Sequence, residues 1–208
     1  MKFLEYCLAV SDNHYFDANP QTPSKEKSIE VQLAERTVKV VTDSGVFSSA
    51  GIDKGTQILL KHSALSPQEG TVMDLGAGWG SISIELALAN PGLNVLAVEV
   101  NSRALELIEK NKKSLEIQNM QTVALEEVPS ESVDQIWSNP PIRIGKVALH
   151  KLLVEAFSKL KPGGEAFLVV QKHLGSDSLA RWLEQDQSHK LQRIDNSKGF
   201  RVFRVTKD

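Results

Sequence analysis

The sequence contains one cysteine, Cys7, and no long hydrophobic run. A single cysteine excludes an internal disulfide and a cysteine-based metal cluster. No stretch is apolar for long enough to span a bilayer, and residues 1–10 lack the basic start, apolar core and small-residue cleavage site of a signal peptide. We therefore expect a cytoplasmic protein with no membrane partner, in which Cys7 is structural or incidental.

A strong net charge is also missing, since the formal value at pH 7 is -2. The protein as a whole therefore does not attract nucleic acid, and any RNA or DNA binding would need a local basic patch. No histidines and carboxylates have metal-ligand spacing, and no nucleophile elbow or catalytic triad is apparent. We expect no metal. Hydrophobic residues at 41% in a chain of 208 residues are sufficient for one well-cored globular domain.

The first part of the chain predicts an extension with a β-hairpin. Residues 1–27 are polar and irregular, but apolar and polar residues alternate from Ile29 to Val40 around a possible turn at 34–36. We expect this hairpin to pack on the rest of the protein as a lid or flank. A loop rich in glycine and small hydroxyl residues follows, and a helix passes through residues 58–60. We thus divide the chain into an N-terminal extension (1–60) and a main domain (61–208), packed as one compact unit.

From residue 71 onwards the pattern alternates between strands and helices. This alternation predicts an α/β, Rossmann-like fold with a seven-stranded, mostly parallel sheet and helices on both faces. Ser102 is the expected N-cap of the second of these helices, and the Lys-Pro-Gly-Gly sequence at 161–164 is expected to end the third. The expected strands are 72–75, 94–98, 122–124, 132–137, 165–170 and two within 191–205; the expected helices are 81–90, 102–115, 146–160 and 178–185.

Glycines at alternate positions, Gly76, Gly78 and Gly80, lie between the first strand and helix, directly after Asp74. A side chain at Gly76 or Gly78 would block the close approach of a ligand to the backbone, and the following helix presents unpaired amide hydrogens. The turn therefore predicts a nucleotide-cofactor site. Its spacing differs from the Gly-x-Gly-x-x-Gly pattern expected for NAD.

Three polar segments follow the ends of three strands. They are the glycine turn, Glu99 and Asn139, and ligands of open α/β sheets bind beyond the carboxyl ends of the strands. We expect all three on one edge of the sheet. Glu99 follows the glycine turn by roughly 20 residues, so it is positioned to accept hydrogen bonds from both ribose hydroxyls of a cofactor. A dehydrogenase would share these features, so they leave nicotinamide and S-adenosylmethionine open.

The Asn139-Pro140-Pro141-Ile142 sequence favours methyl transfer to a planar amine or amide. Such a nitrogen is a poor nucleophile, because its lone pair is delocalised into the adjoining π-system. The Asn139 side-chain oxygen and the Pro140 carbonyl can accept its hydrogens and direct the lone pair, while the prolines fix the loop and Ile142 offers an apolar face. In-line attack on a sulfonium methyl group needs mainly positioning, and no metal.

The motifs at 74–80, 99, 138–142 and 161–164 together resemble the signature set of class I S-adenosylmethionine-dependent methyltransferases. More narrowly, segments 42–48, 52–56, 142–146 and 198–201 are similar to the small-domain guanine-N2 rRNA methyltransferases (RsmC-like). The resemblance implies S-adenosylmethionine as the cofactor and Asn139, Pro140, Pro141 and Ile142 as the catalytic residues. It implies cofactor binding by Asp74, Gly76, Ala77, Gly78, Gly80, Glu99 and Val100, with Phe47 and Asp53 in a loop over the site.

The same resemblance implies methylation of guanine N2 in small-subunit ribosomal RNA, with ribosomal RNA or the small ribosomal subunit as partner and a monomer or homodimer as the active form. The target base would be unstacked and turned into the pocket. Two departures concern binding. The short segment 124–129 leaves only Glu126 for the adenine amine, and the chain has no room for the second domain copy of some relatives. Substrate docking would then depend on the hairpin, a second subunit, or local basic residues: Arg143, Lys146, Lys172, Lys198 and Arg201.

Two other functions stay open. The same loop would suit a protein glutamine-N5 methyltransferase, and a third possibility is a non-catalytic descendant that acts as an assembly or binding module. His150 lies one helical turn beyond Lys146, and we interpret it as a packing or surface residue.

Overall fold

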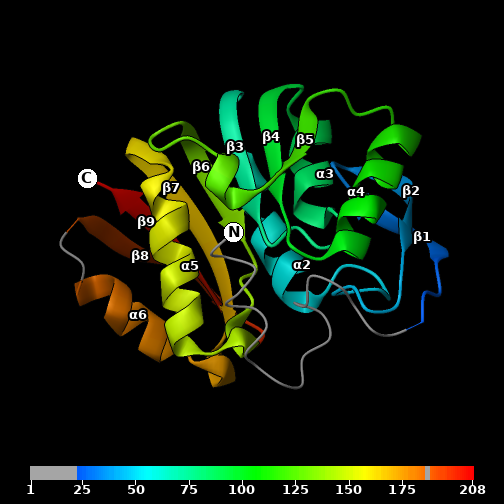
Figure 1. Ribbon diagram of the computed structural model, residues 1–208. Helices are drawn as coiled ribbons and strands as arrows, with labels where there is room; N and C mark the ends of the chain where they lie inside the picture. Colours follow the sequence, from blue (N-terminus) through cyan, green and yellow to red (C-terminus); the bar gives the residue numbers. More distant parts are fainter. Residues whose placement is uncertain (1–22, 186–187) are drawn as a thin grey trace.

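The computed structural model describes residues 23–185 and 188–208 (Figure 1). Our expectations for Cys7, for an irregular segment before residue 23 and for the missing signal peptide lie outside these residues. A seven-stranded sheet runs through the centre, in the order β5-β4-β3-β6-β7-β9-β8. The strands are β3 (Glu69–Leu75), β4 (Gly92–Val98), β5 (Met120–Val123), β6 (Val133–Ser138), β7 (Leu160–Gln171), β8 (His189–Ser197) and β9 (Phe200–Lys207).

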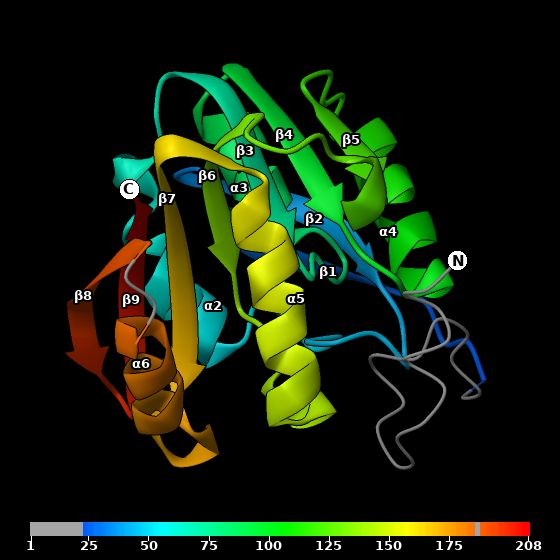
Figure 2. The same cartoon turned by 60° about the vertical axis from the view of Figure 1, so that its left-hand side comes forward.

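The first five strands of this sheet are parallel, whereas β9 pairs antiparallel with both β7 and β8. The helices lie on both faces (Figures 1 and 2): side chains of α2, α3 and α4 share one core cluster with Val72, and those of α5 and α6 share another with Met73. The expected α/β fold is therefore confirmed. The helices are α2 (Lys54–Leu60), α3 (Ser81–Ala89), α4 (Ser102–Ser114), α5 (Lys146–Ser158) and α6 (Ser176–Gln185).

The central strands are apolar without interruption because both of their faces are covered. Neighbouring residues of β3 point to opposite sides, so Val72 packs toward α3 and Met73 toward α5, and neither is exposed. The helices are amphipathic in turn: α5 buries Leu149, Leu153 and Phe157 along one face. This arrangement leaves the carboxyl ends of β3, β4 and β6 at one edge of the sheet.

The expected hairpin forms from β1 (Lys27–Leu33) and β2 (Arg36–Thr42), which pair antiparallel. Val31, Leu33, Val38 and Val40 form its buried face. The hairpin packs outside α3 and α4, as a third layer on that side (Figure 1), so it is a flank. Its two turn residues, Ala34 and Glu35, both have positive φ, and the Ala34 amide donates to the buried Glu85 carboxylate of α3 at 2.5 Å.

Two local expectations were wrong. Asn101, rather than Ser102, caps α4: its side-chain oxygen accepts hydrogen bonds from the amides of Arg103 and Ala104, while its amide nitrogen donates to the Gly45 carbonyl. Both residue types cap helices well, so the contact with Gly45 decides between them. The segment 161–164 does not act as the helix terminator, because α5 already ends at Ser158. It lies inside β7, at a register irregularity opposite Val133 and Gln135.

One buried side chain, Asn111 of α4, connects the hairpin to the turn between β3 and α3. Its oxygen accepts from the Val41 amide at 2.7 Å, and its nitrogen donates to the carbonyls of Val41 and Trp79 at 3.0 and 3.1 Å. The residue is fully buried, so the amide has no contact with solvent. Asn111 thus satisfies three backbone groups of two segments that are distant in the chain.

We expect Asn111→Ala to lower the free energy of unfolding by about 2–3 kcal/mol, because it leaves these three backbone groups without their partner. Urea unfolding followed by circular dichroism measures the effect. Asn94→Ala, at an exposed position of β4, is the matched control and should change the free energy by less than about 0.5 kcal/mol. Equal effects of the two substitutions would contradict the connecting role of Asn111.

Candidate active site

The glycine turn lies at the carboxyl end of β3, where the strand order reverses between β4 and β6. Gly76 and Gly78 have φ of 78° and 58°, values that favour glycine. The amides of Gly76 and Ala77 both donate to the Val98 carbonyl, at 2.9 and 3.1 Å, which connects the turn to the end of β4. An added Cβ at Gly76 or Gly78 would have no protein atom closer than 4.0 or 3.9 Å, so it would occupy open space above the turn.

Asp74 is completely buried just before this turn. One carboxylate oxygen accepts hydrogen bonds from the Ser83 amide at 2.9 Å and from its hydroxyl at 2.6 Å, whereas the other has no protein partner. Burial raises the pKa of Asp74 to about 7. The hydrogen bonds from Ser83 lower this pKa, and the charge of Glu99 raises it. A buried acceptor without a partner fits a ligand that brings a hydrogen-bond donor or a positive charge.

The Glu99 carboxylate accepts three backbone hydrogen bonds. Gly78 donates to one oxygen at 2.8 Å, and Val100 and Asn101 donate to the other at 2.7 and 3.0 Å. Burial raises the pKa of Glu99 above its usual value, although these three hydrogen bonds lower it. With two lone pairs on each oxygen, only the oxygen that accepts from Gly78 retains one of them. Glu99 therefore has the capacity to accept one more donor, such as a ribose hydroxyl.

The Asn139 loop begins where β6 ends. The hydroxyl of Ser138 donates to the Leu75 carbonyl at 2.7 Å, so the ends of β6 and β3 are held together. Pro141 has φ and ψ of -73° and 72°, and the Ile142 amide donates to the Pro140 carbonyl at 2.8 Å. These values define an inverse γ-turn, which fixes the direction of the Pro140 carbonyl.

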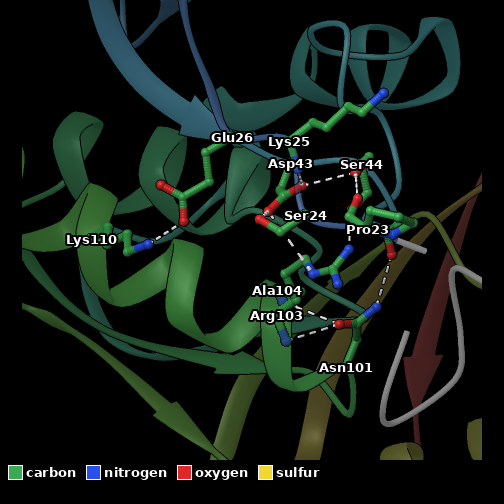
Figure 3. A network of polar contacts seen from close by, with 11 residues as sticks. Pro23, Ser24, Lys25, Glu26, Asp43, Ser44, Asn101, Arg103, Ala104 and Lys110 are labelled. Atoms are coloured by element: carbon green, nitrogen blue, oxygen red, sulfur yellow. Dashed lines mark hydrogen bonds and ion pairs between the residues drawn. The ribbon is translucent and has the colours of Figure 1, made fainter. Parts of the chain in front are cut away.

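A polar network holds the segment 43–47 over the same edge (Figure 3). The buried Asp43 accepts from the Ser24 hydroxyl at 2.5 Å and the Lys25 amide at 2.6 Å, and it forms an ion pair with Arg103. Burial by itself raises the pKa of Asp43, but the hydrogen bonds and the Arg103 charge outweigh it and keep the pKa below its ordinary value. Arg103 also donates to the Ser44 carbonyl at 2.6 Å. This network, which the sequence patterns did not reveal, positions Phe47.

These segments enclose one pocket of about 210 Å³. Nine of the expected site residues line it: Phe47, Asp53, Gly76, Gly78, Glu99, Asn139, Pro140, Pro141 and Ile142. Asp74, Ala77, Gly80 and Val100 lie next to these residues in the chain but do not line it. Arg143, which we expected only as a basic residue for substrate docking, also lines it, and we did not single out five others from the sequence: Val46, Ala104, Gln171, Leu174 and Phe200. Val46 and Phe200 had a signal, since they belong to segments 42–48 and 198–201, but Gln171 at the end of β7 and Leu174 after it have no motif.

Other candidates lie away from the pocket lining. Glu126 is exposed on a short 3₁₀ turn, and Arg201 donates to the Ser176 hydroxyl at 3.1 Å and pairs with Asp177. His150 stacks on Trp182 with ring centroids 3.8 Å apart, which confirms our interpretation of a packing residue. Burial and the neighbouring Lys146 lower its pKa.

Metal-ligating side chains do not gather anywhere in residues 23–185 and 188–208: no three histidine, cysteine or carboxylate groups lie close enough to hold an ion. Across the same described residues, none of the helices combines the length and apolar character required to cross a bilayer.

Comparison with known proteins relates almost the whole described chain to one family, since residues 37–204 match the model of the methyltransferase small domain. The sequence is 29% identical over 198 residues to YbxB of Bacillus subtilis, an uncharacterized protein, and the match covers 93% of this chain and 98% of YbxB. It is 30% identical over 171 residues to ribosomal RNA small subunit methyltransferase C of Shewanella sediminis, which covers 76% of this chain and 48% of that protein.

Among solved structures, the fold is similar to the 16S rRNA N2 methyltransferase RsmC of T. thermophilus, determined in complex with AdoMet and guanosine. The TM-score is 0.75 at 24% identity, over 91% of this chain and 52% of RsmC. At this identity the likeness concerns the fold. The chain spans about half the length of both rRNA methyltransferases that it matches.

The raised pKa of Asp74 predicts a pH-dependent stability. Between its ordinary pKa of 3.8 and the folded value of about 7, the folded state binds a proton that the unfolded state has lost, so stability falls as pH rises. Relative to Asp74→Asn, the wild-type free energy of unfolding should fall by roughly 2 kcal/mol from pH 5 to pH 7 and then level off. Urea unfolding of both proteins at pH 5, 6, 7 and 8 measures this difference.

Asp134→Asn is the matched control for this prediction. Burial raises the pKa of Asp134, but its hydrogen bond and ion pair with Lys161 lead to a pKa below the ordinary value, so it stays ionised over the whole range. The corresponding stability difference should be flat from pH 5 to pH 8. A flat difference for Asp74→Asn as well would show that its carboxyl ionises normally.

Proposed function

The chain belongs to the methyltransferase small domain family, and on that premise we propose that it transfers a methyl group from S-adenosylmethionine to the exocyclic N2 amine of a guanine in small-subunit ribosomal RNA. The observation that supports this most is the convergence of Asn139, the glycine turn and Glu99 on one pocket. The rRNA methyltransferases among the relatives support the substrate class, although the chain corresponds to only about half of their length. Such a substrate would place the protein in the cytoplasm, as a monomer or homodimer on ribosomal RNA or the small subunit.

The residues at the turn fit S-adenosylmethionine. The absent side chains of Gly76 and Gly78 leave room for a ligand against the backbone, and Glu99 retains a lone pair for a ribose hydroxyl. Asp74 offers a buried acceptor without a protein partner, which suits the positive charge of the methionine moiety. Ala77, Gly80 and Val100 would support this binding as the neighbours that shape the turn and the end of β4, and Phe47 and Asp53 would border the ligand.

S-adenosylmethionine, when bound, would supply an electrophilic methyl group. The amine nitrogen would bond to this group through its lone pair, the C–S bonding electrons would stay on sulfur, and a proton would pass from the amine to solvent. The protein contributes positioning. The Asn139 side-chain oxygen and the Pro140 carbonyl accept the two amine hydrogens, and the γ-turn at Pro141 keeps the carbonyl direction constant. Ile142 packs against the planar ring.

Residues around the pocket also suit an unstacked base. Phe47 and Leu174 line the pocket although their side chains are 40% and 39% exposed, and Arg143 contributes a positive charge beside them. Exposed aromatic and apolar groups stack on bases that are turned out of a helix, and arginine pairs with phosphate. These three residues provide a local RNA-binding surface on a protein whose net charge is only -2.

The substrate class can be tested with methyl-labelled S-adenosylmethionine, the protein, and an extract from cells that lack this gene. We expect label in material that nuclease digests and protease does not, followed by recovery of N2-methylguanosine from the small-subunit RNA. Label released only by protease would favour the glutamine-N5 alternative. No labelled product, with no binding of S-adenosylhomocysteine, would favour a non-catalytic module.

Asn139→Ala should reduce the methyl-transfer rate by about 100- to 1000-fold or more, because it removes one of two acceptors for the amine. Binding of S-adenosylhomocysteine, measured by calorimetry, should change by less than about threefold, since Asn139 acts on the acceptor substrate. Asn94→Ala again serves as the control, with full activity expected. Loss of transfer and of cofactor binding together would refute the separation of roles.

A further inference from the structure

The amide of Asn139 has a directional problem. A carboxamide can rotate by 180° and exchange its oxygen for its nitrogen, which have nearly the same size. Only the oxygen accepts a hydrogen from the target amine, whereas the NH₂ group would repel it. A reaction that depends on Asn139 as an acceptor therefore requires a feature that selects one of the two orientations.

Helix α2 and the residue before it provide this selection. The Asn139 side-chain nitrogen donates to one carboxylate oxygen of Asp53 at 3.1 Å and to the Thr56 hydroxyl at 3.1 Å. An ionised carboxylate only accepts hydrogen bonds, so it specifies that the nitrogen faces α2. The Asn139 oxygen then lies on the opposite side of the amide group, directed away from α2.

Asp53 and Thr56 are themselves held in place. The same Asp53 oxygen accepts from the amides of Gly55 at 2.8 Å and Thr56 at 3.2 Å, which makes Asp53 the N-cap of α2. Thr56 is buried, with 3% of its surface exposed, and α2 packs against β7 and β9. Thr56 is therefore part of the packed interior, and Asp53, which is half-buried at the pocket, is held by the cap of α2.

Gly55 supports the same geometry. A Cβ at this position would lie 3.0 Å from the Phe200 ring, 3.1 Å from the Asp53 oxygen and 3.3 Å from the Asn139 nitrogen. These distances are tighter than ordinary van der Waals contact. The residue without a side chain thus allows Asp53 and Asn139 to approach each other beside the pocket.

We propose that Asp53 and Thr56 are positioning residues for the catalytic orientation of the Asn139 amide: the Asp53 carboxylate, which only accepts, selects the orientation, and the buried Thr56 hydroxyl helps to hold it. This inference rests on the proposed function, in which Asn139 accepts a hydrogen from the target amine. It assigns Asp53 to Asn139 rather than to direct contact with the cofactor. The orientation is set before substrate binds, so the acceptor need not reorganise during the reaction.

Thr56→Val is the sharpest test, because valine has nearly the same shape, fits the helix and removes only the hydroxyl. We expect kcat to fall about 10- to 100-fold, with KM for S-adenosylmethionine and binding of S-adenosylhomocysteine unchanged within twofold. Thr56→Ser restores a hydroxyl and should recover most of the rate. Thr37→Val, which removes an exposed hydroxyl that accepts from Gln32 in the hairpin, is the matched control and should keep the wild-type kcat.

Asp53 is tested by a pair of substitutions to residues that are both favourable at a helix N-cap. Asp53→Gly removes the side-chain acceptor for Asn139, so kcat should fall as in Thr56→Val. Asp53→Asn keeps an acceptor at the right length and should recover much of that loss. Equal kcat values for these two substitutions would overturn the role of Asp53. A wild-type kcat in Thr56→Val would overturn the role of Thr56.

A readout independent of catalysis is the side-chain NH₂ signal of Asn139 in ¹H–¹⁵N NMR spectra, assigned from its absence in Asn139→Asp. Its protons should exchange slowly in the wild type and rapidly in Thr56→Val and Asp53→Gly. Rapid exchange in the wild type would overturn the proposed orientation. Slow exchange that Thr56→Val abolishes, in a protein that transfers no methyl group to RNA, would support the orienting contacts and refute the proposed function.

Discussion

The hydrogen bonding of β3 on both of its sides is the constraint on which the rest of the structure depends. Its backbone pairs in parallel with β4 on one side and β6 on the other, so the chain must cross over in opposite directions after β3 and after β5. The loops after β3, β4 and β6 consequently meet at one edge. The glycine turn, Glu99 and the Asn139 loop become neighbours for this reason alone.

Packing around this sheet and side-chain hydrogen bonds hold the residues of that edge in place. Both faces of β3 are covered, and the hairpin adds a further layer over α3 and α4 through Asn111. The site residues are then held by side chains outside the pocket, such as Ser138 on Leu75 and Arg103 on Asp43. Methyl transfer without a metal relies on positioning, and this structure supplies it through buried hydrogen bonds.

Charge is used locally within this arrangement. Asp74 is buried and Glu99 is half-buried, and desolvation raises the pKa of both carboxyls, whereas the pKa of the buried Asp43 is lowered by its hydrogen-bond donors and Arg103, which outweigh its burial. The first two lie where the cofactor is proposed to bind. Asp43 instead holds the segment that carries Phe47, so similar side chains differ in role according to their partners.

The sequence by itself determined the order of strands and helices, the glycine turn and the Asn139 loop, because these depend on local periodicity and on residues adjacent in the chain. The family resemblance drawn from those motifs is confirmed. The sequence did not determine that Asn101 rather than Ser102 caps α4, that segment 161–164 lies within β7, or that Gln171 and Leu174 line the pocket. Only the tertiary structure decided these and the contact of Asn139 with Asp53, 86 residues away. Such pairings depend on distances between packed elements, and no local pattern specifies those distances.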